Sequence, residues 1–187
     1  MMPSLLPATL TSWQGKPPLI AIRKPNFSAD RKLIRRFLLH EEWPWLARTE
    51  HAILWETAIQ TGFQAGEIRR IRPEHLGADY ISLPAKLTKN KQDARQYITK
   101  SLRDRLVEAL PFVVPDEERL AELLRHDLAV ARASAEKAKD QKLTNGFLEP
   151  VNSLDHVLDF HALRHTCGAW LVIANVNLKV VQKVMRH

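Results

Sequence analysis

Three basic side chains share one predicted helical turn near the carboxyl end of the sequence. In the segment His161-Ala-Leu-Arg164-His165 the spacings are three and four residues, so all three side chains can project from one face. An arginine guanidinium offers phosphate oxygens a planar, two-pronged donor, and a histidine ring adds a further N–H donor. This turn therefore predicts a binding site for a phosphate group.

The same turn admits two other interpretations. Together with Cys167, the side chains of His161 and His165 could ligate a metal ion, but the pattern offers no clear fourth ligand. Histidines four residues apart are also common on ordinary helix surfaces and in cores. On the local pattern alone, a purely structural role for these side chains is favoured.

A second cluster of basic residues lies between residues 86 and 105. Seven Lys or Arg residues stand there against two acidic residues. The central Lys89-Asn-Lys91 could enter a DNA groove and bring an ammonium group to a phosphate ester. The alternative is a solvated hairpin edge that its lysines protect from strand pairing, and on the local pattern alone this alternative is favoured.

Several common chemistries have no signal in the sequence. The chain has a single cysteine, which excludes an internal disulfide framework. With six glycines in the chain, neither of the usual glycine-rich nucleotide-binding patterns occurs. There is no Cys-x-x-Cys, no His-Glu-x-x-His and no recognisable nucleophile elbow. We therefore expect neither a metal ion nor a cofactor.

The composition is that of a folded protein with a basic surface. Of the 187 residues, 45% are hydrophobic and 26% are charged, which argues against a disordered or coiled-coil chain. The formal net charge of +7 fits a nucleic-acid partner, and charge alone fits a merely basic surface equally well. The sequence shows no membrane-spanning stretch and no signal peptide, so we expect a cytoplasmic, nucleoid-associated protein without membrane contacts.

The first part of the chain divides into an arm and a helix. Five of the eleven prolines precede residue 26, so residues 1–27 are predicted to be a proline-rich arm or linker, and residues 28–187 one domain. A helix is predicted from Ser28, because Leu33, Ile34, Phe37 and Leu38 recur at helical spacing. Its opposite face carries Arg35 and Arg36.

The remaining elements are mainly helical, with one small sheet. Helices are predicted over about 49–61, 101–110, 116–142 and 159–175 and from Asn177 onward, with a short one around residues 68–71. Strands near residues 80–83 and 97–99 form a hairpin around a polar tip. The predicted fold class is α+β, mainly α-helical, with a small antiparallel sheet.

Four motifs follow one another in an order that resembles one enzyme family. They are Thr61-Gly-Phe-Gln64-Ala-Gly-Glu67-Ile with Leu76, Thr88-Lys89-Asn-Lys91 with Arg95, Asp159-Phe-His161-Ala-Leu-Arg164-His165-Thr, and Val181-Gln-Lys-Val-Met-Arg-His187. From about residue 28 to the last residue, the chain resembles the catalytic domain of the tyrosine recombinases, the phage integrase family. The resemblance implies that family's mainly helical fold, double-stranded DNA as the partner, and other recombinase protomers as possible partners.

In that family a tyrosine hydroxyl attacks a DNA phosphodiester, and basic side chains stabilise the charge on the phosphate without a metal ion. The resemblance implies that Arg164 and His161 bind the phosphate, that Lys89 is the general acid and that His187 is a late phosphate-binding histidine. Glu67 and His165 would support these groups. The residues expected to contact DNA are Arg35, Arg36, Lys89, Lys91, Arg95 and Arg164. We expect the phosphate-facing Arg164 to be solvated in the free protein.

Two side chains that the family reaction needs are not found at their expected positions. Gln64 stands where the first motif should carry an arginine, and an amide lacks the charge of a guanidinium. The nucleophilic tyrosine should follow shortly after His187, and Tyr80 and Tyr97 belong to the predicted strands. The catalytic domain is therefore expected to be incomplete at its carboxyl end, and the family's N-terminal clamp domain is expected to be missing.

The sequence thus predicts site-specific DNA recombination or integration as the family activity. This chain is expected to be a DNA-binding but cleavage-deficient fragment or degenerate relative. One alternative is a non-catalytic DNA-binding or recombinase-interacting protein that reuses the scaffold. Another is an active enzyme of which these 187 residues are an incomplete part.

Overall fold

The structure, a computed structural model, describes residues 33–138, 143 and 146–186. The predicted arm over residues 1–27 and the predicted site residue His187 lie outside the described residues. The α+β class is confirmed, because the described part consists of helices and one two-stranded antiparallel sheet.

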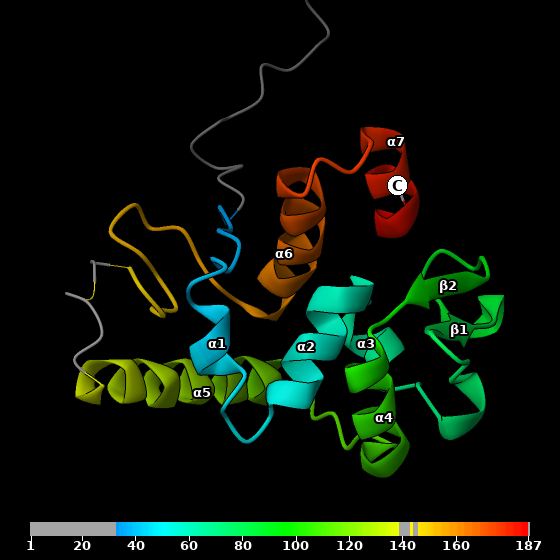
Figure 1. The fold of residues 1–187 in the computed structure, drawn as a ribbon, viewed down its shortest axis with the longest axis horizontal. Coiled ribbons are helices and arrows are strands. Elements are labelled where there is room, and N and C mark those ends of the chain that lie inside the picture. Colours follow the sequence, from blue (N-terminus) through cyan, green and yellow to red (C-terminus); the bar gives the residue numbers. More distant parts are fainter. Residues whose placement is uncertain (1–32, 139–142, 144–145, 187) are drawn as a thin grey trace, which may run out of the picture. The chain divides into compact units, whose positions relative to one another are not determined.

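Five of the helices form the framework around the core. These are α1 (Trp43–Leu46), α2 (Ala52–Thr61), α5 (Glu117–Lys137), α6 (Phe160–Ile173) and α7 (Leu178–Met185). Helix α2 packs against α6, α1 against α5, and α7 against α6 (Figure 1). Buried side chains from α2, α5 and α6 meet in one cluster that includes Trp55, Leu124 and Leu163.

Polar contacts fasten α5 to the framework. Asp127 of α5 is almost fully buried, and its carboxylate accepts the indole N–H of Trp55 at 2.8 Å. The backbone N–H of His51, just before α2, donates to the same carboxylate at 3.3 Å. A buried carboxylate needs such donors to offset its lost hydration, so these bonds fix the position of α5 relative to α2.

The predicted hairpin is present, but its second strand lies at residues 94–97 rather than at the predicted 97–99. Strands β1 (Tyr80–Leu83) and β2 (Ala94–Tyr97) pair antiparallel, with Tyr80 opposite Tyr97 and Leu83 opposite Ala94. Between them lies the short 3₁₀ turn η3 (Ala85–Leu87). The Thr88 hydroxyl donates to the Gln92 carbonyl at 2.8 Å and accepts from the Gln92 N–H at 3.2 Å. This closure holds the tip that carries Lys89.

Side-chain caps set where most helices begin, largely as the sequence predicts. The carboxylate of Asp159 caps α6, that of Asp116 caps α5 and the amide of Asn177 caps α7. Helix α4 (Lys100–Ala109) differs, because the Thr99 hydroxyl accepts the Leu102 N–H and starts it two residues before the predicted Ser101. The short elements α3 (Ala65–Ile68) and η2 (Pro73–His75) complete the chain.

The helix predicted from Ser28 is wrong for the described residues 33–39. Arg35 forms a parallel bridge with Val157, and the Arg36 N–H donates to the Val157 carbonyl at 3.1 Å. Leu38 is buried, whereas Leu33 and Ile34 of the predicted apolar face are exposed. The segment is extended because its backbone pairs with a distant segment, a tertiary interaction that local periodicity does not report.

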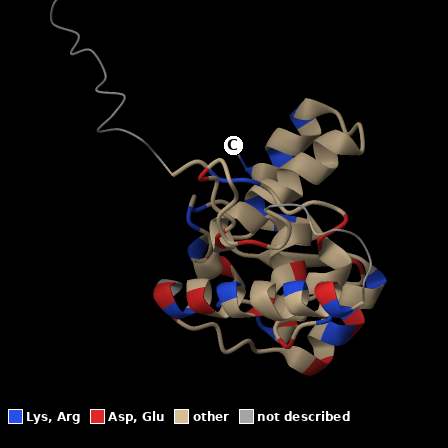
Figure 2. Ribbon diagram, turned by 90° about the vertical axis from the view of Figure 1, so that its left-hand side faces the viewer, with Lys and Arg blue, Asp and Glu red and all other residues tan. Residues whose placement is uncertain are grey.

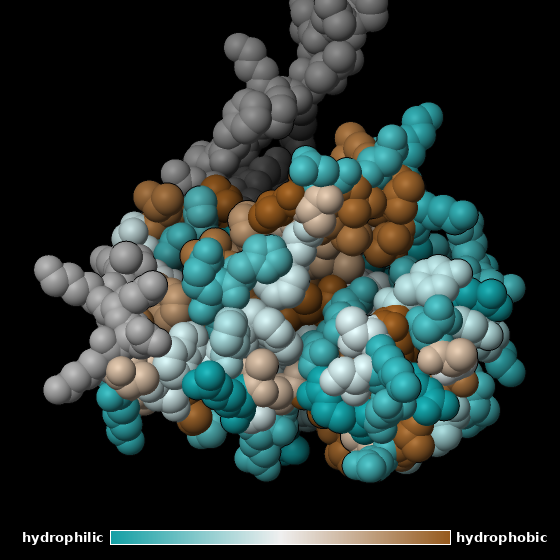
Figure 3. All heavy atoms as spheres, in the orientation of Figure 1, coloured by the Kyte–Doolittle hydropathy of each residue, from teal (hydrophilic) through white to brown (hydrophobic). Residues whose placement is uncertain are grey.

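Apolar side chains gather on the surface of α6 and α7. Figure 3 shows this hydrophobic area in the orientation of Figure 1. Val172, Ile173, Leu178 and Val180 are each about half exposed. None of the described helices is long and apolar enough to cross a membrane.

Replacing Leu163 tests the core. Leu163→Ala should lower the free energy of unfolding by about 2–5 kcal/mol, because the side chain is fully buried between α6 and its neighbours. Ile173→Ala on the same helix is the matched control, and we expect a change within about 0.5 kcal/mol since that side chain is half exposed. Urea denaturation measures both, and equal effects would contradict the packing described here.

Candidate functional site

An open cavity of about 680 Å³ brings together residues from three of the four sequence motifs. Gln64 and Glu67 come from the start of α3, Lys89 from the hairpin tip, and His161 and Arg164 from the first turns of α6. These segments are far apart in the sequence. The structure therefore places most of the sequence-predicted site residues around one space.

The carboxylate of Glu67 connects three of the segments around the cavity. Its oxygens accept the backbone N–H of Gln64 at 2.9 Å and that of Lys89 at 3.2 Å. They also accept both terminal nitrogens of Arg186, at 2.7 and 2.6 Å. Glu67 can reach back to Gln64 because it is the third residue of α3, the position from which a glutamate caps its own helix.

The environment of Glu67 keeps it ionised. Burial is the largest influence on this carboxyl group and by itself raises its pKa. The hydrogen bonds and charge of Arg186, with the backbone N–H groups of Gln64 and Lys89, act in the opposite direction and together lower the pKa of Glu67 below its usual value. The group is therefore a carboxylate at neutral pH.

Arg164 is buried, and the expectation of a solvated side chain is wrong. Its two terminal nitrogens donate to the carbonyls of Gly62 and Met185, so the guanidinium links the end of α2 to the end of α7. Gly62 is the left-handed C-cap of α2, with φ of 61°. Burial, followed by the positive charge of Arg186, lowers the pKa of Arg164. Arg164 thus lines the cavity as a fixed charge with a structural role.

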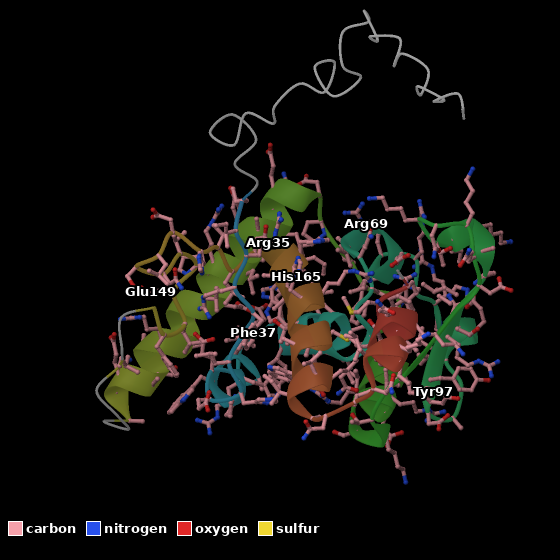
Figure 4. The ribbon with its side chains drawn as sticks, turned by 90° about the horizontal axis from the view of Figure 1, so that it is seen from above. Arg35, Phe37, Arg69, Tyr97, Glu149 and His165 are labelled. Atoms are coloured by element: carbon pink, nitrogen blue, oxygen red, sulfur yellow. The ribbon has the colours of Figure 1, made fainter. Side chains whose placement is uncertain are left out.

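His161 faces the cavity, and His165 lies beside it one turn later on α6. Their rings meet edge to face with centroids 5.1 Å apart. Partial burial, and then the positive charge of Arg35, lower the pKa of His161. A neutral His161 still carries one ring N–H for a ligand oxygen. Figure 4 shows Arg35 and His165 on neighbouring segments, the extended chain and α6.

The hairpin contributes one residue to the cavity and carries two basic residues outside it. Lys89 is exposed and lines the cavity, and its backbone N–H donates to Glu67. Lys91 is exposed at the tip, and the Arg95 guanidinium lies 4.3 Å from the centre of the Tyr80 ring. Neither tyrosine of the chain lines the cavity, and Figure 4 shows Tyr97 on the hairpin.

The two arginines expected at DNA on the extended segment have different surroundings. Arg35 lines the cavity, with its Nε within 2.8–2.9 Å of both carboxylate oxygens of Asp159. The guanidinium of Arg36 instead forms two bonds, at 2.8 and 2.9 Å, with the fully buried Glu42. It also donates to the carbonyl of Glu149 at 2.9 Å. The Arg36 guanidinium is therefore occupied by these partners, and Arg36 does not line the cavity.

Two further arginines belong to the site and were not expected from the sequence. Arg70 lines the cavity and donates to the Leu87 carbonyl at 3.0 Å, beside the hairpin tip. Arg186 binds Glu67 although 119 residues separate them. Arg70 could have been found from the sequence, because it lies one turn after Glu67. Nothing in the sequence pattern indicates that Arg186 pairs with Glu67.

The charge balance of the cavity favours an anion. Four Lys or Arg side chains line it, namely Arg35, Arg70, Lys89 and Arg164, against the carboxylates of Glu67 and Asp159. Each carboxylate is already paired with an arginine. Among the described residues, Arg70, Lys89 and Arg164 form no ion pair with a carboxylate, and Arg164 is bound by backbone carbonyls. A phosphate group would therefore meet an excess of positive charge.

The structure does not support the alternative of a metal site at His161, His165 and Cys167, because these side chains do not converge on one point. Within the described ranges no three His, Cys, Asp or Glu side chains are arranged to hold a metal ion. Cys167 packs with Val181 and Met185, and burial raises the pKa of its thiol to about 11. His161 lines the cavity instead.

Comparison with known sequences gives one family. The sequence model of the phage integrase family matches residues 40–187. A search of the curated proteins gives no match.

Solved structures of recombinases share the fold. The XerA recombinase has a TM-score of 0.57 at 16% identity, and the match covers 90% of this chain and 61% of that one. The integrase from mycobacterium phage Brujita gives 0.60 at 20%, covering 91% and 54%. The Tn1549 transposon integrase, in complex with a circular intermediate DNA, gives 0.55 at 13%, covering 84% and 60%. The chain thus spans between half and two thirds of the length of these proteins.

The ionisation of Glu67 should make the free energy of unfolding depend on pH. Because its folded pKa lies below its usual value near 4.5, ionisation stabilises the fold above that pH, and the contribution is lost as the pH falls through the folded pKa. Glu67→Gln should therefore cost about 3–5 kcal/mol at pH 7 and less at pH 3. Urea denaturation at several pH values measures this.

The exposed Glu74 provides the control for that experiment. Glu74→Gln should leave the free energy of unfolding unchanged across the same pH range, because the side chain is solvated. A Glu67→Gln cost that is equally large at pH 3 and pH 7 would show that the charge of Glu67 is not what stabilises the fold.

Proposed function

The chain belongs to the phage integrase family, and on this premise we propose that its cavity binds a backbone phosphate of double-stranded DNA in site-specific recombination or integration. The observation that carries the proposal is that Lys89 from one motif meets His161 and Arg164 from another around one cavity. A phosphodiester carries its charge on two non-bridging oxygens, and these donors can approach it from several sides.

Each of three cavity residues has a distinct proposed role toward the phosphate. Arg164 provides a fixed positive charge, since its terminal N–H groups are engaged by backbone carbonyls. His161 provides a neutral N–H donor for a phosphate oxygen, because its pKa is lowered. Lys89 reaches the cavity from the hairpin tip and is proposed as the general acid, a role that needs an ammonium near the leaving oxygen.

The proposed DNA surface extends beyond the cavity. Arg35 and Arg70 line the cavity, and Lys91 and Arg95 continue the positive charge along the hairpin. Figure 2 shows basic residues and no acidic ones on α6 and α7, whereas both kinds alternate along α5. DNA is therefore proposed to approach the side of the hairpin and of α6 rather than that of α5.

The neighbouring structures support DNA as the partner. The Tn1549 transposon integrase structure contains a circular intermediate DNA, and a structure of the XerH recombinase is bound to its difH substrate. Exchange of strands between two duplexes requires more than one protein site, so other recombinase protomers are included as proposed partners. Residence on the nucleoid follows from the proposed DNA partner.

DNA cleavage by these 187 residues is not part of the proposal. The family reaction needs a tyrosine beside the phosphate, and Tyr80 and Tyr97 both lie on the sheet and outside the cavity lining. Gln64 lines the cavity without a charge. We propose binding without formation of a phosphotyrosyl bond by the chain as given.

A DNA titration tests the proposed function. Fluorescence anisotropy with a labelled duplex should give a Kd of roughly 10⁻⁴ to 10⁻⁶ M that weakens steeply with salt. Lys89→Ala should weaken binding and reduce the salt slope by about one, because one phosphate contact is lost. The melting temperature should remain unchanged, since the Lys89 side chain is exposed.

Lys137→Ala, at the far end of α5, is the matched control and should bind as the unmodified chain does. Salt-independent binding, or equal losses for both variants, would contradict the proposed site. The same incubations on a denaturing gel should show no protein–DNA adduct, and an adduct would show that another residue serves as nucleophile.

A further inference from the structure

Arg186 occupies an unusual place at the end of α7. It is the C-cap residue, with φ of 55° and ψ of 44°, a left-handed conformation that favours glycine. Its guanidinium reaches back to Glu67 and makes two charge-assisted hydrogen bonds at 2.7 and 2.6 Å. An arginine thus stands at a position whose backbone conformation favours glycine, and its side chain forms a strong ion pair there.

The surroundings of this guanidinium confine it beside the cavity. Only 11% of the Arg186 side chain is exposed, and its guanidinium carbon lies 5.1 Å from the centre of the Phe63 ring. Its Nε is buried and has no hydrogen-bond partner among the described residues. Phe63 and Glu67 both line the cavity, so Arg186 lies directly behind two of its walls.

The carboxylate of Glu67 creates an electrostatic problem for a phosphate site. An uncompensated negative charge in the cavity wall would repel a phosphate. An arginine at position 64 could compensate it, because that position lies three residues before Glu67 on the same turn and also lines the cavity. Gln64 has no charge to contribute.

We propose that Arg186 supplies, from the end of α7, the fixed guanidinium charge that position 64 lacks. It is a positioning residue: it compensates Glu67, and Glu67 in turn holds the backbone N–H of Lys89 at the cavity. This inference rests on the proposed function, since it assumes that the cavity receives a phosphate of DNA. It predicts that the charge can be moved from residue 186 to residue 64 without loss of binding.

The test is an exchange of the two residue types. Arg186→Gln alone should weaken duplex binding by about tenfold, because the charge of Glu67 is left uncompensated beside the phosphate. The double variant Gln64→Arg/Arg186→Gln has the composition of the unmodified chain and should bind within about twofold of it. Arg186→Lys should fall between them, since an ammonium retains the charge but not the two-pronged geometry.

The affinities are compared by anisotropy at one salt concentration and at a temperature at which circular dichroism shows each variant folded. Arg36→Gln is the structural control. Its guanidinium also makes two bonds to a buried glutamate, Glu42, and its Nε is also buried without a partner, but it does not line the cavity. This variant should lose stability and keep its affinity for DNA.

Two outcomes would overturn the inference. One is an Arg186→Gln variant that is folded and binds DNA as tightly as the unmodified chain. The other is an exchange variant that binds DNA as weakly as Arg186→Gln. That result would show that a guanidinium at residue 64 cannot replace the one at residue 186.

A second readout separates this inference from the proposed function. The pKa of the Glu67 carboxyl group can be measured without DNA by carbon NMR. It should be higher in Arg186→Gln than in the unmodified chain, and in the exchange variant it should fall back to the value of the unmodified chain. If the unmodified chain failed to bind DNA, the proposed function would fall, while this readout would still decide whether a guanidinium at residue 64 can replace Arg186. An unchanged pKa in Arg186→Gln would overturn the inference by itself.

Discussion

One buried carboxylate, that of Glu67, organises the candidate site. It accepts hydrogen bonds from the start of α3, from the hairpin tip and from the end of α7, which are separate in the sequence. Burial of a carboxylate is unfavourable unless hydrogen-bond donors replace its lost hydration. The buried charge of Glu67 is therefore tolerated only while all three segments remain in contact with it. The positions of Lys89 and of α7 therefore depend on the ionisation of one side chain.

The same interaction explains how a cavity that contains acidic groups can attract an anion. Glu67 is compensated by Arg186 and Asp159 by Arg35, so the charges of Lys89 and Arg70 are left for a ligand. Arg164 adds a further charge while its N–H groups bind the carbonyls of Gly62 and Met185. Arg164, which is proposed as part of the phosphate site, thus also links α2 to α7, so replacing it would change both the cavity and the stability of the fold.

The parts of this structure that were predictable from sequence are those with local causes. Asp159 and Asp116 cap the helices that follow them, and the strand pattern gives the hairpin. The family motifs led to Lys89, His161 and Arg164, which line one cavity. The wrong helix prediction has a non-local cause, because the backbone of Ile34 and Arg36 pairs with the distant Val157. Arg36 is likewise bound by the distant Glu149 carbonyl, and Arg186, which the sequence pattern did not indicate, is bound by Glu67.

Mapping of amide chemical shifts during titration with a short DNA duplex tests the central claim most directly. The account places a phosphate in the cavity between α3, the hairpin tip and α6, so the largest changes should fall on the backbone amides of Gln64 and Lys89 and on the first turn of α6. Their size should decrease when salt is added. Changes concentrated on α5, with the amides around Glu67 unaffected, would contradict the account.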